Sequence, residues 1–157
     1  ALDFDQAALE LGYVTTEELD RARDQLINAM ALQNVVRRPI SDELVVISDP
    51  GSVRAESIRM LRTQIISQHI KNGRRGLAVV STSDGQGCSY VTANLAVALA
   101  QVGYKILLVD ANMRNPRQDQ IFGLDPNAPG LSSFLSLQVA RPERVVNANV
   151  LPGLALI

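Results

Sequence analysis

The feature that most constrains the fold is a glycine-containing loop set between an apolar run and a helical pattern. The run LAVV at 77–80 is short, apolar and partly β-branched, which is typical of a buried strand. A loop follows at 81–88, a helix is expected from about Ser89 to Val102, and Gly103 supplies its stop. The segment YKILLVD at 104–110 indicates a second buried strand. This order is a βαβ unit, which predicts a parallel sheet with a right-handed crossover.

Helices are expected ahead of this unit. Thr15 and Glu18 have the spacing of a capping box at the start of an amphipathic helix in 13–33. A linker follows, in which Pro39 and Pro50 flank the apolar run 44–47 and argue against a continuous helix. A second helix is predicted after Ser52, with an apolar stripe at Ala55, Ile58, Leu61, Ile65 and Ile66. Near the end, LSSFLSL at 131–137 suggests a short helix and LPGLALI at 151–157 a strand.

Composition limits the class of protein. The chain has 157 residues, 46% of them hydrophobic and only 4% aromatic, which favours one domain with an aliphatic α/β or α core. A formal net charge of −1 gives no electrostatic reason to expect a nucleic-acid partner. A single cysteine excludes an internal disulfide and gives no reason to expect a disulfide partner, and no apolar run approaches the roughly 20 residues that span a bilayer. We therefore expect a cytoplasmic protein.

The loop resembles a phosphate-binding loop in some of its working parts. Gly85 and Gly87 would let backbone N–H groups point at a phosphate, and Ser89 stands where a Mg²⁺-binding hydroxyl belongs. The pattern G-x-x-x-x-G-K-[ST] would place a glycine at Thr82 and a lysine at Cys88, and both are absent. From the residues alone, a phosphate site and a strand-to-helix turn with no ligand are equally open.

A carboxylate at the end of the second predicted strand supports the phosphate site. Asp110 would lie at the carboxyl edge of a parallel sheet, where ligands bind in open α/β folds. There it could hold Mg²⁺, position its water or act as a base. The alternative is an ordinary exposed acid at a strand end. Arg114 and Arg117 follow, and either could replace the missing cation or be a surface charge.

Several spaced motifs resemble the bacterial tyrosine kinases (BY-kinases) of exopolysaccharide assembly, which are P-loop ATPases of the deviant Walker type. The family pattern is roughly S-x-x-P-G-E-G-K-S-x-x-x-x-N-L-A followed by L-L-x-D-x-D-x-R-x-P. The chain matches it at Ser81, Gly85, Gly87, Ser89, Asn94, Leu95, Ala96, Asp110, Arg114 and Pro116, and GLSSFL at 130–135 is similar to a later family motif. The resemblance covers about Asp42 to Ile157.

The resemblance implies a P-loop NTPase-like α/β fold, a parallel sheet with flanking helices preceded by N-terminal helices. Residues 1–40 would be a helical segment and linker, and 41–157 an incomplete kinase-like domain. No later strand with the second (Walker B) acid is found, so the chain resembles a truncated piece with that strand beyond Ile157. The implied cofactors are ATP or ADP with Mg²⁺. The implied nucleotide residues are Gly85, Gln86, Gly87, Cys88, Ser89, Tyr90 and Arg114, with Ser89 and Asp110 on the metal and Asp110 as the catalytic residue.

A second family signature lies in the preceding helix. AESIRMLR matches E-x-x-R-x-x-R through Glu56, Arg59 and Arg62, which the family uses for contacts between subunits of a ring. Residues at i, i+3 and i+6 share one side of a helix, so they could face a neighbour or form ion pairs within a solvated face. The implied partners are further copies of the chain and a membrane polysaccharide co-polymerase, the chain-length determinant, which would hold the protein at the inner membrane.

Two departures leave the activity open. Cys88 replaces the lysine of the loop, and a thiol cannot supply its positive charge; Asn112 replaces the second acid of D-x-D and cannot take a proton. The first candidate function is an ATP-dependent protein-tyrosine (auto)kinase that regulates exopolysaccharide chain length and export. The second is an inactive pseudokinase adaptor that still assembles with the co-polymerase. The third is a partition-type ATPase, which the absence of an extra lysine at 82–84 disfavours.

Overall fold

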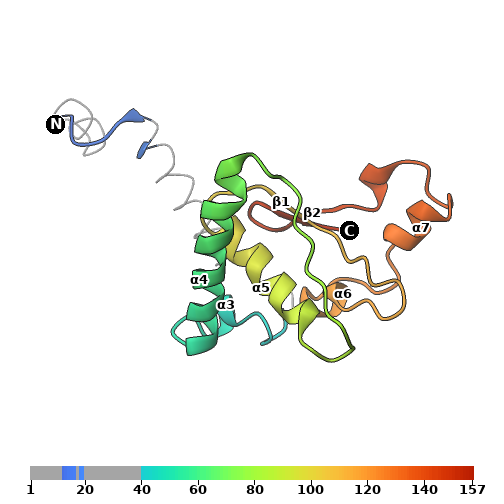
Figure 1. Ribbon diagram of the computed structural model, residues 1–157. Coiled ribbons are helices and arrows are strands. Elements are labelled where there is room, and N and C mark those ends of the chain that lie inside the picture. The colour runs from blue at the N-terminus through green and yellow to red at the C-terminus, as the bar shows by residue number, and fades with distance from the viewer. Residues whose placement is uncertain (1–11, 17, 20–39) are drawn as a thin grey trace.

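The computed structural model describes residues 12–16, 18–19 and 40–157, and its class is α/β, as expected. A long helix, α4 (Val53–Gln68), packs on α5 (Cys88–Ala100), and α5 in turn contacts β1 (Ile106–Leu108) and β3 (Leu154–Leu156) (Figure 1). The central layer is therefore a helix, with α4 on one side and a small sheet on the other. No helix within the described ranges has the length and apolar character needed to cross a membrane.

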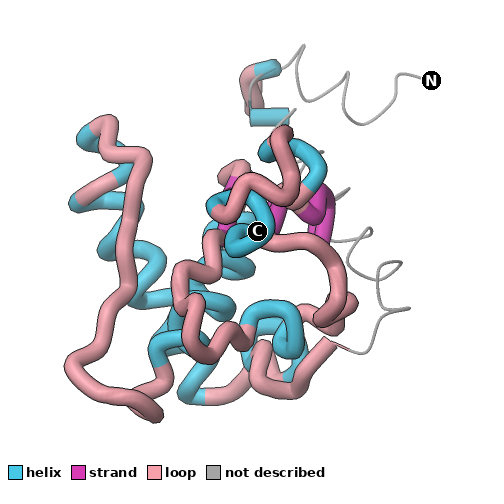
Figure 2. The backbone as a smooth tube through the Cα atoms, turned by 90° about the vertical axis from the view of Figure 1, so that its right-hand side faces the viewer, coloured by secondary structure: helices cyan, strands magenta, loops and turns pink. Residues whose placement is uncertain are grey.

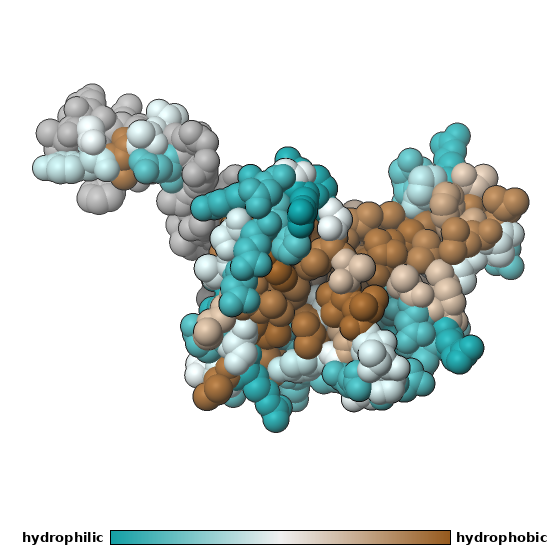
Figure 3. Space-filling model, in the orientation of Figure 1, coloured by the Kyte–Doolittle hydropathy of each residue, from teal (hydrophilic) through white to brown (hydrophobic). Residues whose placement is uncertain are grey.

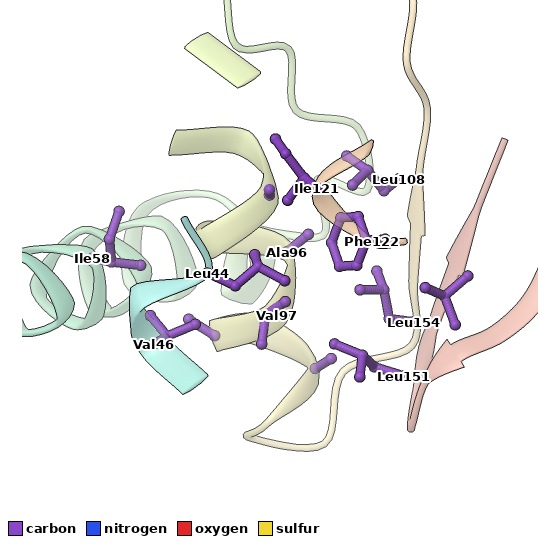
Figure 4. Packing of buried hydrophobic residues seen from close by; sticks show 14 of the residues in the cluster. Leu44, Val46, Ile58, Ala96, Val97, Leu108, Ile121, Phe122, Leu151 and Leu154 are labelled. Atoms are coloured by element: carbon purple, nitrogen blue, oxygen red, sulfur yellow. The ribbon is translucent and has the colours of Figure 1, made fainter. Parts of the chain in front are cut away.

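Helix α5 is buried along most of its length. All eight residues from Ala93 to Ala100 are buried, since this stretch is apolar apart from Asn94. Its small alanines let neighbouring elements approach closely, and Val97 packs with Leu44, Leu108, Phe122 and other apolar side chains in one cluster (Figure 4). The aliphatic core that the composition predicts is thus built around α5.

Helix α4 begins and packs as predicted. The Ser52 hydroxyl accepts a hydrogen bond from the Ala55 amide at 3.2 Å, which caps the first turn. Of the expected stripe, Ala55, Ile58 and Ile65 are buried, while Leu61 and Ile66 are partly buried against a second cluster with Leu95 and Leu99. A 3₁₀ turn, η1 (Ile70–Asn72), follows and ends at Gly73, whose φ is 77°.

Three strands form the sheet, in the order β1-β3-β2. β1 and β3 pair in parallel, as the α/β pattern predicts, and β2 (Asn147–Leu151) adds an antiparallel strand that the sequence analysis missed. β2 and β3 are joined by a tight turn at Pro152 and Gly153, so the sheet is mixed. Gly153 has a φ of 74°, and a Cβ there would lie 3.2 Å from the Tyr104 carbonyl oxygen, which explains the need for glycine.

The first predicted strand is not a strand, and this expectation was wrong. Residues 74–81 form neither helix nor strand, and the side chains of Leu77 and Val80 are 50% and 84% exposed. The physical reason is the lack of a neighbour, because within the described chain 76–81 make no backbone–backbone hydrogen bond. The βαβ unit with its right-handed crossover is therefore not formed, and the segment runs as a long loop beside the rest of the molecule (Figure 2).

A free edge of β1 faces this loop. Ile106 and Asp110 donate their amides to Gly153 and Ile157 on the β3 side, so the backbone groups of Leu107 and Val109 point to the opposite side. The side chains of Leu107 and Val109 are 55% and 45% exposed. Apolar residues accordingly gather on the face beside α4 in the space-filling view (Figure 3).

The remaining predictions have mixed outcomes. The capping box is confirmed, because the Thr15 amide donates to Glu18 Oε2 at 2.9 Å and the Glu18 amide to Thr15 Oγ1 at 3.2 Å. Most of the helix expected in 13–33 lies outside the described residues. The apolar run in the predicted linker forms a short helix, and LSSFLSL contains the expected one. The shorter helices are α3 (Val45–Ser48), α6 (Gln118–Ile121), α7 (Leu131–Leu135) and the 3₁₀ turn η2 (Pro142–Arg144).

Candidate nucleotide site

The glycine loop is open at the amino end of α5. Gly85 and Gly87 have φ values of 79° and 81°, and a Cβ at either position would meet no atom within 4 Å. Gly87 caps α5 without a side-chain hydrogen bond, so the first amides of the helix have no partner within it. We define the loop cavity as the cavity of about 280 Å³ lined by Ser81, Asp84, Gly85, Gln86, Gly87, Cys88, Ser89, Tyr90, Asn112, Asn115 and Arg117. The residues 85–90, which the resemblance implies for the nucleotide, all line it.

Cys88 occupies the position of the missing lysine and is turned toward the protein backbone. Its side chain is half-buried, and its Sγ donates to the Val79 carbonyl oxygen at 3.3 Å. The thiol thus ties the start of α5 to the segment that precedes the loop. It brings no positive charge to the loop cavity.

Asp110 is held by backbone amides. Its Oδ2 accepts from the amides of Arg117 at 2.9 Å and Gln118 at 3.0 Å, and its Oδ1 accepts from Asn112 at 3.1 Å. The carboxylate therefore fixes the start of α6, a role that favours an acid because α6 begins there without a side-chain cap from its own N-cap residue. Asp110 does not line the loop cavity, whereas Asn112 does.

Asp110 and Ser89 meet in a second cavity. We define the strand cavity as the space of about 560 Å³ between residues 77–81, the start of α5 and residues 107–112. Both predicted metal residues line it, as does Gln118. Gln118 is buried, and its Nε2 donates to the Ser89 carbonyl at 3.1 Å while its Oε1 has no hydrogen-bond partner in the described structure. The structure thus brings together the two residues predicted for Mg²⁺.

Arg117 and Arg114 differ in their positions. Arg117 lines the loop cavity, and its Nη2 donates to Glu43 Oε1 at 2.7 Å. Arg114 is exposed and lines neither the loop cavity nor the strand cavity. The family resemblance implied Arg114 as a nucleotide residue, whereas the structure places Arg117 at the loop cavity and Arg114 outside both cavities.

Glu56, Arg59 and Arg62 of α4 line neither the loop cavity nor the strand cavity. Arg59 Nη1 forms an ion pair with Glu56 Oε2 at 2.8 Å, and Arg59 also donates to the Pro50 carbonyl. The Glu56 side chain is 62% exposed, and Arg62 is half-buried. An intrahelical ion pair is therefore present, and an exposed carboxylate remains available on this face.

Sequence reasoning missed two residues that shape the site. Glu43 lies in the predicted linker, and only the fold brings it to Arg117, 74 positions away. Nothing in the sequence marks Gln118 as a site residue except that it follows Asp110 by eight positions.

Asn94 was matched as part of the family motif, and the structure shows why an amide stands there. It is fully buried, accepts from the Val46 amide at 3.2 Å, and donates to the carbonyls of Glu43 and Tyr90 at 2.8 and 2.9 Å.

Comparison with known proteins identifies relatives of one kind. The chain is 33% identical over 120 residues to the tyrosine-protein kinase YwqD of Bacillus subtilis, an alignment that covers 76% of this chain and 50% of YwqD. The chain spans about half the length of YwqD and of the putative tyrosine-protein kinase CapB of Staphylococcus aureus, and a smaller share of longer relatives, such as 19% of the tyrosine-protein kinase wzc of Salmonella typhi. No family model matches the sequence.

Solved structures agree with the sequence comparison. The fold is similar to the BceF tyrosine kinase domain, with a TM-score of 0.65 and 32% identity over 87% of this chain and 52% of that domain. It is also similar to the chimerical protein CapA2B2, with a TM-score of 0.61 and 34% identity over 76% of this chain and 52% of that one. Sequence and fold together show that the chain belongs to the family of bacterial tyrosine-protein kinases.

Proposed function

We propose that the chain is the nucleotide-loop half of an ATP-dependent protein-tyrosine kinase of exopolysaccharide or capsule synthesis. The observation that carries this proposal is the open loop at the start of α5, with Ser89 and Asp110 in one adjoining cavity. Names of the relatives support the kinase class over the partition-type ATPase. The kinase would regulate the chain length of the polysaccharide.

The open loop and its backbone amides fit the phosphates of a nucleoside diphosphate. The residues present supply only part of the positive charge that those phosphates need. The two glycines leave the cradle open, and the free amides at the start of α5 favour an anion. Cys88 supplies no cation. ATP bound there would provide the phosphoryl group for transfer to a tyrosine.

Ser89 and Asp110 would hold Mg²⁺ from the strand cavity. Within residues 12–16, 18–19 and 40–157, no cluster of three or more His, Cys, Asp or Glu side chains is arranged to bind a metal. A site with one hydroxyl and one carboxylate suits Mg²⁺, which keeps several waters and takes further oxygens from phosphates. The Asp110 carboxylate accepts three backbone amides, so it is already held in place for this role.

Asn112 limits what the chain can do as a base. Its Oδ1 accepts from the Asn115 amide at 3.1 Å, so it stabilises a turn at the rim of the loop cavity. Asp110, which the family resemblance implies as the catalytic residue, is the acid that we propose for the catalytic acid–base role. If it fails in that role, the protein is the pseudokinase adaptor, which the Cys88 and Asn112 replacements favour.

The domain of residues 41–157 would be completed by one further strand. The free edge of β1 and the unpaired segment 76–81 face each other across the strand cavity, which apolar side chains line on both sides. A strand placed there would pair with both and would turn 77–80 into the strand that the sequence predicts. We propose that the strand carrying the Walker B acid of the family occupies this position.

Helix α4 would provide the contacts through which copies of the chain assemble. Glu56, Arg59 and Arg62 would contact neighbouring copies in a ring, and the ring would meet a membrane co-polymerase at the cytoplasmic side of the inner membrane. The exposure of Glu56 supports such a contact.

Calorimetric titration with MgADP tests the proposed function. We expect weak, saturable binding by the 157-residue chain, because the amides are present and the lysine is not. Absence of binding both here and in a variant with lysine restored at position 88 would refute the nucleotide site.

A further inference from the structure

The loop cavity has one cationic side chain, and it does not come from the loop. Among the described residues that line this cavity, Asp84 and Arg117 are the charged ones. Asp84 opposes an anion. Among the described residues that line the cavity, Arg117 is therefore the one that could bring a positive charge to a phosphate, and it stands 29 positions after Cys88 in the sequence.

The backbone of Arg117 is held in place, whereas its guanidinium group is free to change its hydrogen-bond partner. Its amide donates to Asp110 Oδ2 at 2.9 Å, which anchors the residue at the start of α6. Its side chain is 44% exposed, so the guanidinium can change partner without leaving a buried gap. Its present partner is the Glu43 carboxylate at 2.7 Å.

Glu43 is also held by its backbone. Its carbonyl accepts from the buried Asn94 amide group at 2.8 Å, and its own amide donates to Ser41 Oγ at 3.1 Å. Since Asn94 belongs to α5, the backbone of Glu43 is held beside the helix that carries the loop. The Glu43 side chain is 39% exposed and neutralises the one cation of the cavity.

We propose that Arg117 is the phosphate-binding cation of this chain and that Glu43 is its counter-ion when no nucleotide is bound. A guanidinium can form two parallel hydrogen bonds to a phosphate, so it can exchange the Glu43 carboxylate for a phosphate of the nucleotide. Arg117 would thereby replace the lysine that Cys88 lacks, and Glu43 would compete with the ligand. The inference rests on the proposed function and names the charge that this function requires.

The test is a double-mutant cycle read by calorimetric titration with MgADP. Arg117→Gln should weaken binding at least about tenfold, and Glu43→Gln should strengthen it severalfold because the competing carboxylate is removed. In Glu43→Gln/Arg117→Gln the gain from Glu43→Gln should disappear, which a merely structural role for Glu43 would not produce. Arg117→Lys should retain part of the affinity. Arg141→Gln, an exposed arginine outside the loop cavity, is the control and should leave binding unchanged.

Each remaining outcome decides the question. If the parent chain binds MgADP and Arg117→Gln binds it equally well, or if only Arg114→Gln loses affinity, the inference is overturned while the proposed function stands. If Cys88→Lys binds and neither the parent nor Glu43→Gln does, the loop is a phosphate site without help from Arg117, and the inference is again overturned. If none of these proteins binds, the proposed function falls with it. Circular dichroism of every variant confirms that the fold is kept.

Discussion

Arg117, which lines the loop cavity, donates from Nη2 to Glu43 Oε1 at 2.7 Å, a contact between residues 74 positions apart in the chain. Glu43 lies just before α3, and Arg117 lies just before α6. Asn94 of α5 binds the carbonyl of Glu43, so the geometry of the ion pair depends on an amide in the core. Asn94 therefore links the packing of the core to the position of the Glu43–Arg117 ion pair.

Replacing Asn94 with alanine should destabilise the fold strongly. The change leaves the Val46 amide and the Glu43 carbonyl without their side-chain partners, and each unsatisfied buried group costs about 1–3 kcal/mol. We expect a loss of about 2–4 kcal/mol in the free energy of unfolding, measured in urea. Asn115→Ala, at an exposed turn, is the control and should change stability by less than about 0.5 kcal/mol. An Asn94→Ala protein as stable as the parent would contradict the role assigned to the amide.

Restoring lysine at position 88 should strengthen nucleotide binding. A lysine would bring to the loop cavity the positive charge that a thiol cannot, and a charge-assisted hydrogen bond contributes about 1.5–3 kcal/mol. Cys88→Lys should therefore bind MgADP about 10- to 100-fold more tightly than the parent in calorimetry. Cys88→Ser keeps the size of the side chain without the charge and should not gain affinity. An equal gain in both variants would show that the thiol obstructs the site and that the missing charge is not the cause of weak binding.

The helices could be predicted from the sequence because their signals are local. Ser52 caps α4 through a contact three residues away, and the apolar stretch at 93–100 requires burial wherever the helix packs. The short helix α7 and strand β3 were also predicted. In each case, neighbouring residues determine the element.

The segment 77–80, strand β2 and the ion pair depend on distant partners, so local patterns predict them poorly, although β1 and β3 both lie within apolar runs that were expected to be strands. Leu77–Val80 has the composition of a buried strand, and it remains exposed because no strand lies beside it in the described chain. The Asn147–Leu151 strand is polar at its start and contains Asn149 at a φ of 54°, which hides it from pattern reading. Glu43 becomes part of the site only when Asn94 fixes it against α5.

The charged face of α4 gives a prediction about assembly. The exposed Glu56–Arg59 pair contributes at most about 0.5 kcal/mol to stability, so Glu56→Ala should leave the monomer folded. If Glu56 contacts a neighbouring copy, its loss should lower the mass measured by light scattering. Arg54 points about 200° around the helix from Glu56, so Arg54→Ala is the control and should leave the mass unchanged. An unchanged mass for Glu56→Ala would remove the ring contact from the proposal.

The turn between β2 and β3 should tolerate no side chain. At Gly153 a Cβ would lie 3.2 Å from the Tyr104 carbonyl oxygen, at a φ of 74° that alanine disfavours. Gly153→Ala should therefore lower the free energy of unfolding by about 1–2 kcal/mol in urea. Gly76→Ala, where a Cβ meets nothing within 4 Å and φ is not positive, should be neutral or slightly stabilising. Equal effects at both positions would mean that the close approach to Tyr104 has no energetic consequence.

The unpaired segment before the loop gives a prediction for hydrogen exchange. In the 157-residue chain the amides of 77–80 should exchange at rates close to those of an unfolded peptide, because they have no hydrogen-bond partner in the described structure. The amides of Ile106 and Asp110 donate to Gly153 and Ile157, so they should be protected and serve as the internal control. In a longer form of the protein that supplies a strand to the strand cavity, both 77–80 and the amides of Leu107 and Val109 should become protected together. Slow exchange of 77–80 in the 157-residue chain, or protection of only one side in the longer form, would refute the proposed strand position.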